Sequence, residues 1–337
     1  MAKGKDAEGA SSLRSFKTCP RMYYFDYRLN LRQRKFNDKL AIGTGFHIGV
    51  GVYYANNFNR PLAEMAMEVW ADQMRADAYE MIHTDGTMTG DELDAMISMS
   101  VNSVRRYLDF AELNDDFKVI LVEQEFDLPV WIGSNPIDTA RRNKEPKGQQ
   151  RILRGTRHKG TIDMIVQSPD GRLWVVEHKT AAAFPSLSQL EIDDQLNLYV
   201  LAAKQMFNLD VAGVMYNVTK KIKDEKRTRS EFVQRIMIPK NRESMLATRD
   251  NLYHTCMRIR RDNDHLIELM CPGMHCSWMC AYKQLCSAIQ EGLPWKEIAN
   301  YMYEVKDRDT DKKWENRIED MTLKLYAKQN EGSEHSA

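Results

Sequence analysis

The segment GTIDMIVQSPDGRLWVVEHKTAA, residues 160–182, decides the fold that we expect for this chain. Two apolar runs rich in Ile, Val and Trp flank SPDG, which has the Pro-Asp-Gly chemistry of a tight turn. Runs of this kind joined by a short turn predict a β-hairpin. Asp163 lies on the first strand and Glu177 on the second, so the two carboxylates can approach each other across the hairpin.

The spacing of Glu177 and Lys179 suggests a chemical use for this hairpin. Residues two apart on a strand project from the same face, so these two side chains point together while that of His178 points away. Carboxylates are hard ligands for Mg²⁺ or Mn²⁺, and a bound ion polarises a phosphodiester and lowers the pKa of a water. A nearby ammonium can orient or help deprotonate that water. The His178 carbonyl offers the metal one further oxygen.

Charge spacing alone does not distinguish an active site from an ordinary exposed strand face, where Glu-x-Lys is common. Two further patterns accompany it. Asp163 ends a G-x-x-D sequence that begins at Gly160, and DDQLNLY follows on the next predicted helix. In that helix Gln195 and Tyr199 lie four apart and therefore share one face.

The ordered set G-x-x-D, V-V-E-x-K-T and Q-x-x-x-Y resembles the signature of the PD-(D/E)xK nuclease superfamily, in its RecB-type exonuclease branch. CRISPR-associated and phage-encoded nucleases are among the members it is similar to. The resemblance implies that Asp163 and Glu177 bind the metal and that Lys179 is the catalytic lysine. It also implies that Gln195 and Tyr199 line the site and contact the DNA strand.

The same resemblance assigns a role to His47. Its sequence, G-T-G-F-H, matches the G-x-x-H element that precedes the core in this branch, and the histidine of that element also binds the metal. The match extends over roughly residues 12–286 and thins between 60 and 115 and in the insertion over 133–150.

The resemblance implies an α/β fold, with a restriction-endonuclease-like core whose mixed central β-sheet is flanked by helices. We expect a disordered tail over 1–12, one nuclease domain over 13–290, and a C-terminal helix with a polar tail over 291–337. Within the domain we expect a helical insertion over about 61–112, a basic loop over 133–158 and a metal-cluster segment over 271–286.

Periodicity predicts the remaining elements. We assign no helix to the glycine-broken stretch AIGTGFHIGVGVYY, residues 41–54. The predicted strands and helices cover residues 119–130, 187–207, 211–219, 231–238 and 244–270.

The cysteines suggest a second metal site. Cys271, Cys276, Cys280 and Cys286 lie within sixteen positions, and cysteines in a reducing compartment are not expected to form disulfides. Taken together, these four thiolates suit a tetrahedral zinc ion. In the alternative arrangement the last three, spaced C-x3-C-x5-C, join Cys19 around an iron–sulphur cluster.

The resemblance favours the iron–sulphur arrangement. Nucleases of this branch place one cysteine before the core and three after it, and their cluster pins the two ends of the domain together. This implies a structural 4Fe-4S cluster, with structural Zn²⁺ as the alternative. C-x2-C is the commoner first spacing, so the fourth ligand stays open between Cys19 and Cys271.

Composition sets the remaining expectations. The 48 basic and 48 acidic residues cancel, so net charge neither favours nor excludes a nucleic-acid partner. The basic segment TKKIKDEKRTR, residues 219–229, is a candidate for phosphate contacts between two strands. We find no signal-peptide core and no apolar stretch long enough to cross a membrane, and we expect a cytoplasmic location in a bacterium or a phage-infected host.

We therefore predict a metal-dependent DNA exonuclease that acts on single-stranded DNA or DNA ends, in recombination, repair or phage DNA metabolism. The alternatives are a non-catalytic DNA-binding or adaptor module on the same fold and a structure-specific endonuclease or nickase. The sequence has no G-x-x-x-x-G-K-[ST] motif, so a helicase or recombination partner would be a separate protein. The oligomeric state stays open.

Overall fold

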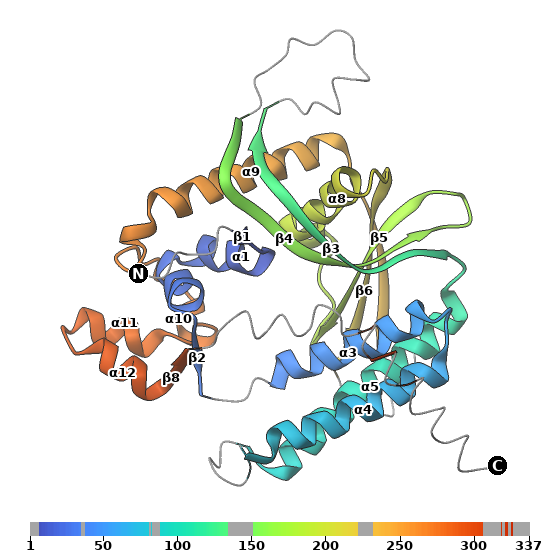
Figure 1. Ribbon diagram of the computed structural model, residues 1–337, viewed down its shortest axis with the longest axis horizontal. Coiled ribbons are helices and arrows are strands. Elements are labelled where there is room, and N and C mark those ends of the chain that lie inside the picture. Colours follow the sequence, from blue (N-terminus) through green and yellow to red (C-terminus); the bar gives the residue numbers. More distant parts are fainter. Residues whose placement is uncertain are drawn as a thin grey trace.

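The computed structural model describes residues 7–34, 38–80, 82, 88–133, 151–221 and 232–305, and beyond them residues 318, 321, 322 and 325. In this part of the chain a mixed β-sheet separates two groups of helices (Figure 1). This arrangement confirms the predicted mixed sheet flanked by helices. The helices on one face are α3 (Asp38–Ala55), α4 (Arg60–Glu80) and α5 (Gly90–Asn114), and those on the other are α8 (Asp194–Met206) and α9 (Arg242–Arg261).

The described sheet has six strands, in the order β1-β4-β5-β6-β7, with β3 paired to β4. The pairs β1–β4 and β5–β6 are parallel and the others are antiparallel. The turn between β4 and β5 uses Gly171 at φ +83, a backbone conformation that favours glycine. The strands are β1 (Ala7–Glu8), β3 (Lys118–Ile132), β4 (Arg151–Gln167), β5 (Leu173–Ala181), β6 (Val211–Lys220) and β7 (Val233–Pro239).

The hairpin partners β4 and β5 stay together over only part of their length. They pair from Gln167↔Leu173 to Met164↔Val176. Beyond that point β4 continues with β3, and β5 continues with β6, so the long β3–β4 pair curves away (Figure 1). Further along, β1 pairs with β4 at Arg157 and His158. We call the opening between residues 159–163 of β4 and residues 177–181 of β5 the fork.

Alternating side chains of β5 are buried on both faces of the sheet. Trp174 and Val176 pack into the hydrophobic core under α3, α4 and α5, whereas Val175 packs into the core under α8. This alternation places Glu177 on the α8 side. His178 lies on the opposite side, stacked on Tyr54 with ring centroids 5.8 Å apart.

The glycine-broken stretch to which no helix was assigned forms most of α3. Its glycines allow close helix packing. A Cβ at Gly45 would lie 2.5 Å from Ser100 Oγ, and one at Gly49 would lie 2.8 Å from Met67 Sδ and from Val104 Cγ1. Glycine weakens an isolated helix, but here it permits α4 and α5 to approach, and burial compensates.

Several expected boundaries also differ. Residues 7–12, placed in a disordered tail, form β1 and the first turn of α1 (Ala10–Thr18). Residues 151–158, expected in the basic loop, belong to β4. The rest of that loop, residues 134–150, and most of the second basic segment, residues 222–231, lie outside the described part of the chain.

The helix expected over 187–207 is interrupted. It consists of α7 (Leu187–Glu191) and α8, and Asp193 caps α8 by accepting the Gln195 N–H at 2.8 Å. Ile192 lies at the break and is 80% exposed. The helix expected over 244–270 ends earlier, because α9 stops at Arg261 and a 3-10 turn, η4 (Asn263–His265), follows.

Residues 20–34 and 275–305, which are far apart in the sequence, form a common lobe. Strand β2 (Leu31–Gln33) pairs with β8 (Tyr303–Val305), and the Phe25 ring lies 5.4 Å from Tyr282 and 5.7 Å from Trp295. None of the described helices is long and apolar enough to cross a membrane. The remaining elements of this lobe are α2 (Pro20–Tyr23), the π-helical turn η1 (Tyr24–Arg28), α10 (His275–Trp278), α11 (Lys283–Gln290) and α12 (Trp295–Met302).

The first prediction concerns Gly160, which pairs with Phe126 across β3 and β4. A Cβ at Gly160 would lie 2.7 Å from Phe126 Cζ, and the Phe126 ring is packed against the rings of His158 and Tyr199, at centroid distances of 5.4 and 5.9 Å. We expect Gly160→Ala to lower the free energy of unfolding by about 1–3 kcal/mol, as overpacking typically does, in denaturant titrations.

The matched control is Gly90→Ala. A Cβ at Gly90 meets nothing within 4 Å, and the residue begins α5. Its stability should be unchanged or should rise by about 0.5–1 kcal/mol. Equal stability of the Gly160→Ala variant and the unsubstituted protein would contradict the packing role of Gly160.

Candidate active site

The candidate site lies at the fork. Asp163 comes from β4, and Glu177 and Lys179 come from β5. At this level β5 no longer pairs with β4, and the backbone N–H of His178 donates instead to Asp163 Oδ2 at 2.8 Å. The separation of the strands therefore makes room for the carboxylate and supplies the donor that fixes it.

Glu177 is fully buried and only half of its carboxylate is satisfied. Its Oε1 contacts the Lys179 ammonium and accepts a hydrogen bond from Gln195 Nε2 at 3.2 Å. Its Oε2 has no hydrogen-bond partner among the described residues. A buried carboxylate oxygen without a partner is unfavourable, so this atom is available to a bound cation.

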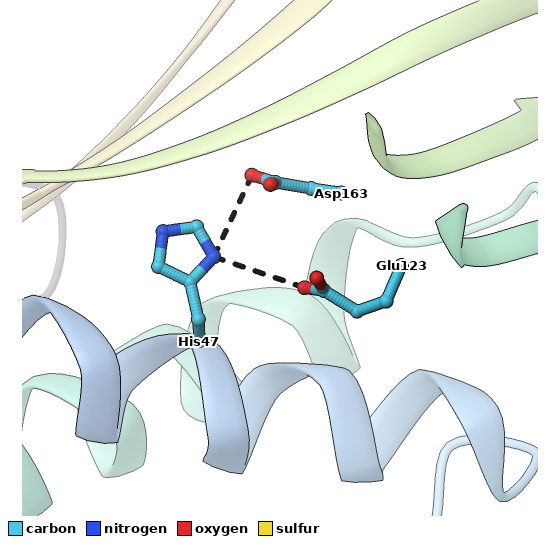
Figure 2. A group of neighbouring side chains, drawn as sticks. All are labelled: His47, Glu123 and Asp163. Atoms are coloured by element: carbon cyan, nitrogen blue, oxygen red, sulfur yellow. Dashed lines mark ion pairs between the residues drawn. The ribbon is translucent and has the colours of Figure 1, made fainter. Parts of the chain in front are cut away.

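Two side chains from other elements complete the group. His47 projects from α3, and its Nδ1 lies 3.6 Å from Asp163 Oδ2 and 3.9 Å from Glu123 Oε1 (Figure 2). Donor atoms of His47, Glu123 and Asp163 all lie within 4.8 Å of one another. In the described part of the chain, this is the one group of three that meets this distance.

Glu123 was not among the residues predicted for the site. The pairs Val122↔Met164 and Gln124↔Ile162 place it opposite Asp163, and its φ of +46 is unusual for a residue other than glycine. Backbone strain of this kind collects at functional sites. The sequence shows Glu123 only as one acid among several on a predicted strand, and only the register identifies it.

Burial controls the electrostatics of the site. It raises the pKa of Asp163 to about 6, although the Lys179 ammonium lowers it in part. Burial, with the Asp163 charge, raises the pKa of Glu177 to about 7. Burial and the Lys179 charge lower the pKa of His47 to about 4, so its ring is neutral at pH 7. A neutral imidazole and two carboxylates that are costly to ionise form a suitable donor set for a cation.

The donor set fits a divalent cation. Oxygen-rich sites with one imidazole suit Mg²⁺ or Mn²⁺. The buried Glu177 Oε2, which has no hydrogen-bond partner among the described residues, would serve as one of the ligands of such an ion. The side chain of His178 is excluded from this role, because it lies between Tyr54 and Tyr107 on the other side of the sheet. The His178 group that reaches Asp163 is the backbone N–H.

The pair Gln195 and Tyr199 lies beside the carboxylates, on the face that the helical spacing predicts. Gln195 Nε2 donates to the Tyr199 hydroxyl at 2.6 Å as well as to Glu177. Arg14 NH2 of α1 is 3.4 Å from Gln195 Oε1. One amide therefore connects α1, α8 and β5.

Five cysteines, all except Cys256 of α9, lie at the lobe that contains β2 and β8. The Cys271 N–H is 3.5 Å from Cys19 Sγ, and burial raises the pKa of Cys280, with smaller increases from the Cys286, Cys276 and Cys19 thiols. No three of the six described cysteine sulphurs lie within 4.8 Å of one another. The thiols are therefore not gathered around a single ion.

A mixed sheet that presents buried carboxylates, a histidine and a lysine at one opening defines a class of nuclease with a restriction-endonuclease-like core. The chain belongs to the PD-(D/E)XK nuclease superfamily, because the model of that family matches residues 9–287. The predicted superfamily and fold are thereby confirmed.

Comparisons with individual proteins add less. A structure of the protein SSO0001 has 13% sequence identity and a TM-score of 0.35, over 86% of this chain and 89% of that one. A "Putative exonuclease" from Eubacterium rectale has 12% identity and a TM-score of 0.43, over 82% of this chain and 88% of that one. No curated protein matches the sequence.

The second prediction concerns stability without metal. The folded-state pKa of Glu177 is raised above its ordinary value of 4.5 to about 7, so the folded protein binds more protons between these values. Stability should therefore fall as the pH rises from about 4.5 to 7. Glu177→Gln removes this loss, and in EDTA it should melt several degrees above the unsubstituted protein at pH 8 and show a smaller gain at pH 5.

The control for this prediction is the cation itself. Mn²⁺ should raise the melting temperature of the unsubstituted protein at pH 8 and that of Glu177→Gln much less, because binding to the folded state stabilises it. The difference in melting temperature between Glu177→Gln and the unsubstituted protein should be larger at pH 8 than at pH 5. A smaller difference at pH 8 would contradict the raised pKa of Glu177.

Proposed function

We propose that this protein is a Mg²⁺- or Mn²⁺-dependent DNA exonuclease that hydrolyses phosphodiester bonds at the fork. The observation that carries the proposal is the buried Glu177 carboxylate, which contacts Lys179 and leaves Oε2 unpartnered beside Asp163. Membership of a nuclease superfamily makes DNA the expected substrate. The sequence resemblance to the RecB-type branch supports an exonuclease acting on single strands or DNA ends.

Lys179 would stabilise charge rather than remove protons. Burial alone would lower the pKa of its ammonium, but the Glu177 and Asp163 carboxylates raise it well above the ordinary value. The group is therefore protonated at neutral pH. A positioned ammonium in a buried site stabilises the negative charge that develops on a phosphoryl oxygen and orients the attacking water.

The residues around Lys179 hold the reacting groups in place. The His178 N–H fixes Asp163 Oδ2, and Gln195 fixes Glu177 Oε1. Burial raises the pKa of Tyr199 well above its usual value, so its phenol stays protonated and accepts from Gln195. We propose that Gln195 and Tyr199 also contact the DNA strand.

The metal would be held by Asp163, Glu177, His47 and Glu123. When bound, it supplies Lewis-acid activation of the phosphodiester and of a water molecule. We also propose the backbone carbonyl oxygen of His178, on the same strand as Glu177, as a further ligand of the metal.

The rival function is a non-catalytic DNA-binding or adaptor module on the same fold. An adaptor has no use for two buried carboxylates with raised pKa values, since burying charge reduces stability without aiding binding elsewhere. The second rival is a structure-specific endonuclease or nickase, which uses the same chemistry and differs only in whether a DNA end is required.

The third prediction tests catalysis. Lys179→Ala and Glu177→Ala should each lower the rate of Mn²⁺-dependent cleavage of labelled single-stranded DNA by at least about 100-fold, as loss of a group that stabilises transition-state charge does. Circular dichroism should show that both variants remain folded. Full activity in both would overturn the catalytic assignment.

Two comparisons test the metal ligands and the type of nuclease. Glu125→Gln changes a neighbouring exposed acid on β3 and should leave activity unchanged, whereas Glu123→Gln should lower it and raise the Mn²⁺ concentration required. A circular single-stranded DNA should resist cleavage. Cleavage of the circle at the rate of the linear strand would favour an endonuclease.

We further propose that Cys19, Cys276, Cys280 and Cys286 hold a structural iron–sulphur cluster. The lobe supports this, because it brings the two ends together: the Arg21 N–H donates to the Leu269 carbonyl at 2.9 Å. The described structure does not show the cysteines clustered for either metal centre, because no three of their sulphurs lie within 4.8 Å of one another.

The fourth prediction tests the cluster. Protein purified without oxygen should be brown, absorb broadly near about 400 nm as thiolate-bound iron does, and contain iron in elemental analysis. Cys19→Ser should lose the absorbance, whereas Cys256→Ser, at a buried thiol of α9, should keep it. A colourless protein containing zinc would contradict the cluster and support the zinc alternative.

A further inference from the structure

A cavity of about 370 Å³ lies beside the proposed catalytic residues, where β1 and α1 pack against β4 and α8. Its walls are the first turn of α1, residues 158–160 of β4, and the face of α8 that carries Gln195 and Tyr199. The Gln195 amide donates both to Tyr199 and to Glu177, so the cavity is one side chain away from the carboxylate. Its volume falls within the range of small-ligand pockets.

One wall of the cavity offers groups that bind phosphate. The first turn of α1 contains no acidic residue, and its N-cap, Gly9, makes no side-chain capping bond. The first N–H groups of a helix lack intrahelical acceptors and, with the helix dipole, favour an anion. Ser11 also lines this wall and adds a hydroxyl, whereas the Lys159 ammonium on β4 pairs with Asp127 Oδ2 at 3.3 Å.

His158 supplies a second, independent indication of a ligand. The side chain lines the cavity, is only 1% exposed, and its Nδ1 lies 2.7 Å from the carbonyl oxygen of Glu8. Because a carbonyl only accepts, Nδ1 carries the proton and Nε2 is an acceptor. Nε2 has no hydrogen-bond partner among the described residues. It therefore suits a ligand that donates from a hydroxyl or an amino group.

The remaining walls are aromatic. Tyr27, Phe126 and Tyr199 line the cavity, and such rings provide surface for a sugar or a base. The nearby buried carboxylate of Glu8 is already engaged by the Ser12 and Tyr23 hydroxyls, at 2.7 and 2.5 Å. A ligand with a phosphate, a hydrogen-bond donor and a flat apolar part matches all of these features.

We propose that this cavity binds the phosphorylated terminal nucleotide of the DNA strand that the active site cleaves. The inference rests on the proposed nuclease function and adds its substrate: a strand end that carries a phosphate. With the terminal nucleotide held between α1 and Tyr199, the next phosphodiester of the strand faces Glu177 and Lys179. The cavity would thus set the distance between the strand end and the cut.

Ser11→Glu tests the cavity without weakening the fold. Ser11 is exposed at the second position of α1, where an acidic side chain stabilises a helix but repels a bound phosphate. The matched control is Ser244→Glu, the same change in the first turn of α9, which lies away from the cavity.

The first measurement uses mononucleotides in EDTA, so that cleavage plays no part. Calorimetric titration compares deoxyadenosine 5′-monophosphate, its 3′-isomer, deoxyadenosine and inorganic phosphate. One of the monophosphates should bind the unsubstituted protein and Ser244→Glu at least 10-fold more tightly than the nucleoside. Ser11→Glu should lose this difference. No preference for a monophosphate, or an unchanged preference in Ser11→Glu, would overturn the inference.

The second measurement uses internally labelled single strands with Mn²⁺, ending in phosphate or hydroxyl at either end. The unsubstituted protein should cleave the strand with the preferred phosphate at least 10-fold faster, and Ser11→Glu should cleave both at the slower rate. Mononucleotide binding without any DNA cleavage would refute the proposed function and keep the cavity assignment. Cleavage with no end preference, together with no mononucleotide binding, would refute the cavity assignment and keep the proposed nuclease function.

Discussion

The separation of β4 from β5 beyond Met164 and Val176 is the constraint on which the site depends. An unbroken sheet would keep helices on opposite faces apart, because its strands lie between them. At the fork the sheet is open, so the side chains of His47 from α3 and Gln195 from α8 reach the same pair of carboxylates, Asp163 and Glu177. The hydrogen bond lost from the ladder is replaced by the bond from the His178 N–H to Asp163.

The fold tolerates an unfavourable site because apolar packing surrounds it on both faces. Trp174, Val175 and Val176, directly before Glu177, are all buried in the cores that flank the sheet. These contacts hold β5 in place while Glu177 and Asp163 remain buried with raised pKa values. The positive φ of Glu123 is a second local strain that the long β3–β4 pairing sustains. Stability supplied elsewhere thus preorganises the proposed cation site.

The parts that the sequence predicts are those encoded locally. The hairpin follows from a turn sequence between two apolar runs, and the Gln195–Tyr199 pair follows from helical spacing. The parts it misses depend on tertiary contacts. The glycines of α3 indicate a helix only once Trp70 and Val104 lie against them. Glu123 is identified only by the register of β3 against β4, and the break at Ile192 only by the cap that Asp193 provides.

The N-terminal segment connects the fork to the lobe at the chain ends. Strand β1 lies beside β4 at residues 157 and 158, beyond the point where β5 leaves, and α1 then leads through Cys19 to α2. The lobe therefore anchors α1, which forms one wall of the cavity, whereas Asp163 and Glu177 are held by the sheet. Arg14 of α1 also contacts Gln195, which holds Glu177, so disturbing the lobe should affect both the cavity and the carboxylate beside it.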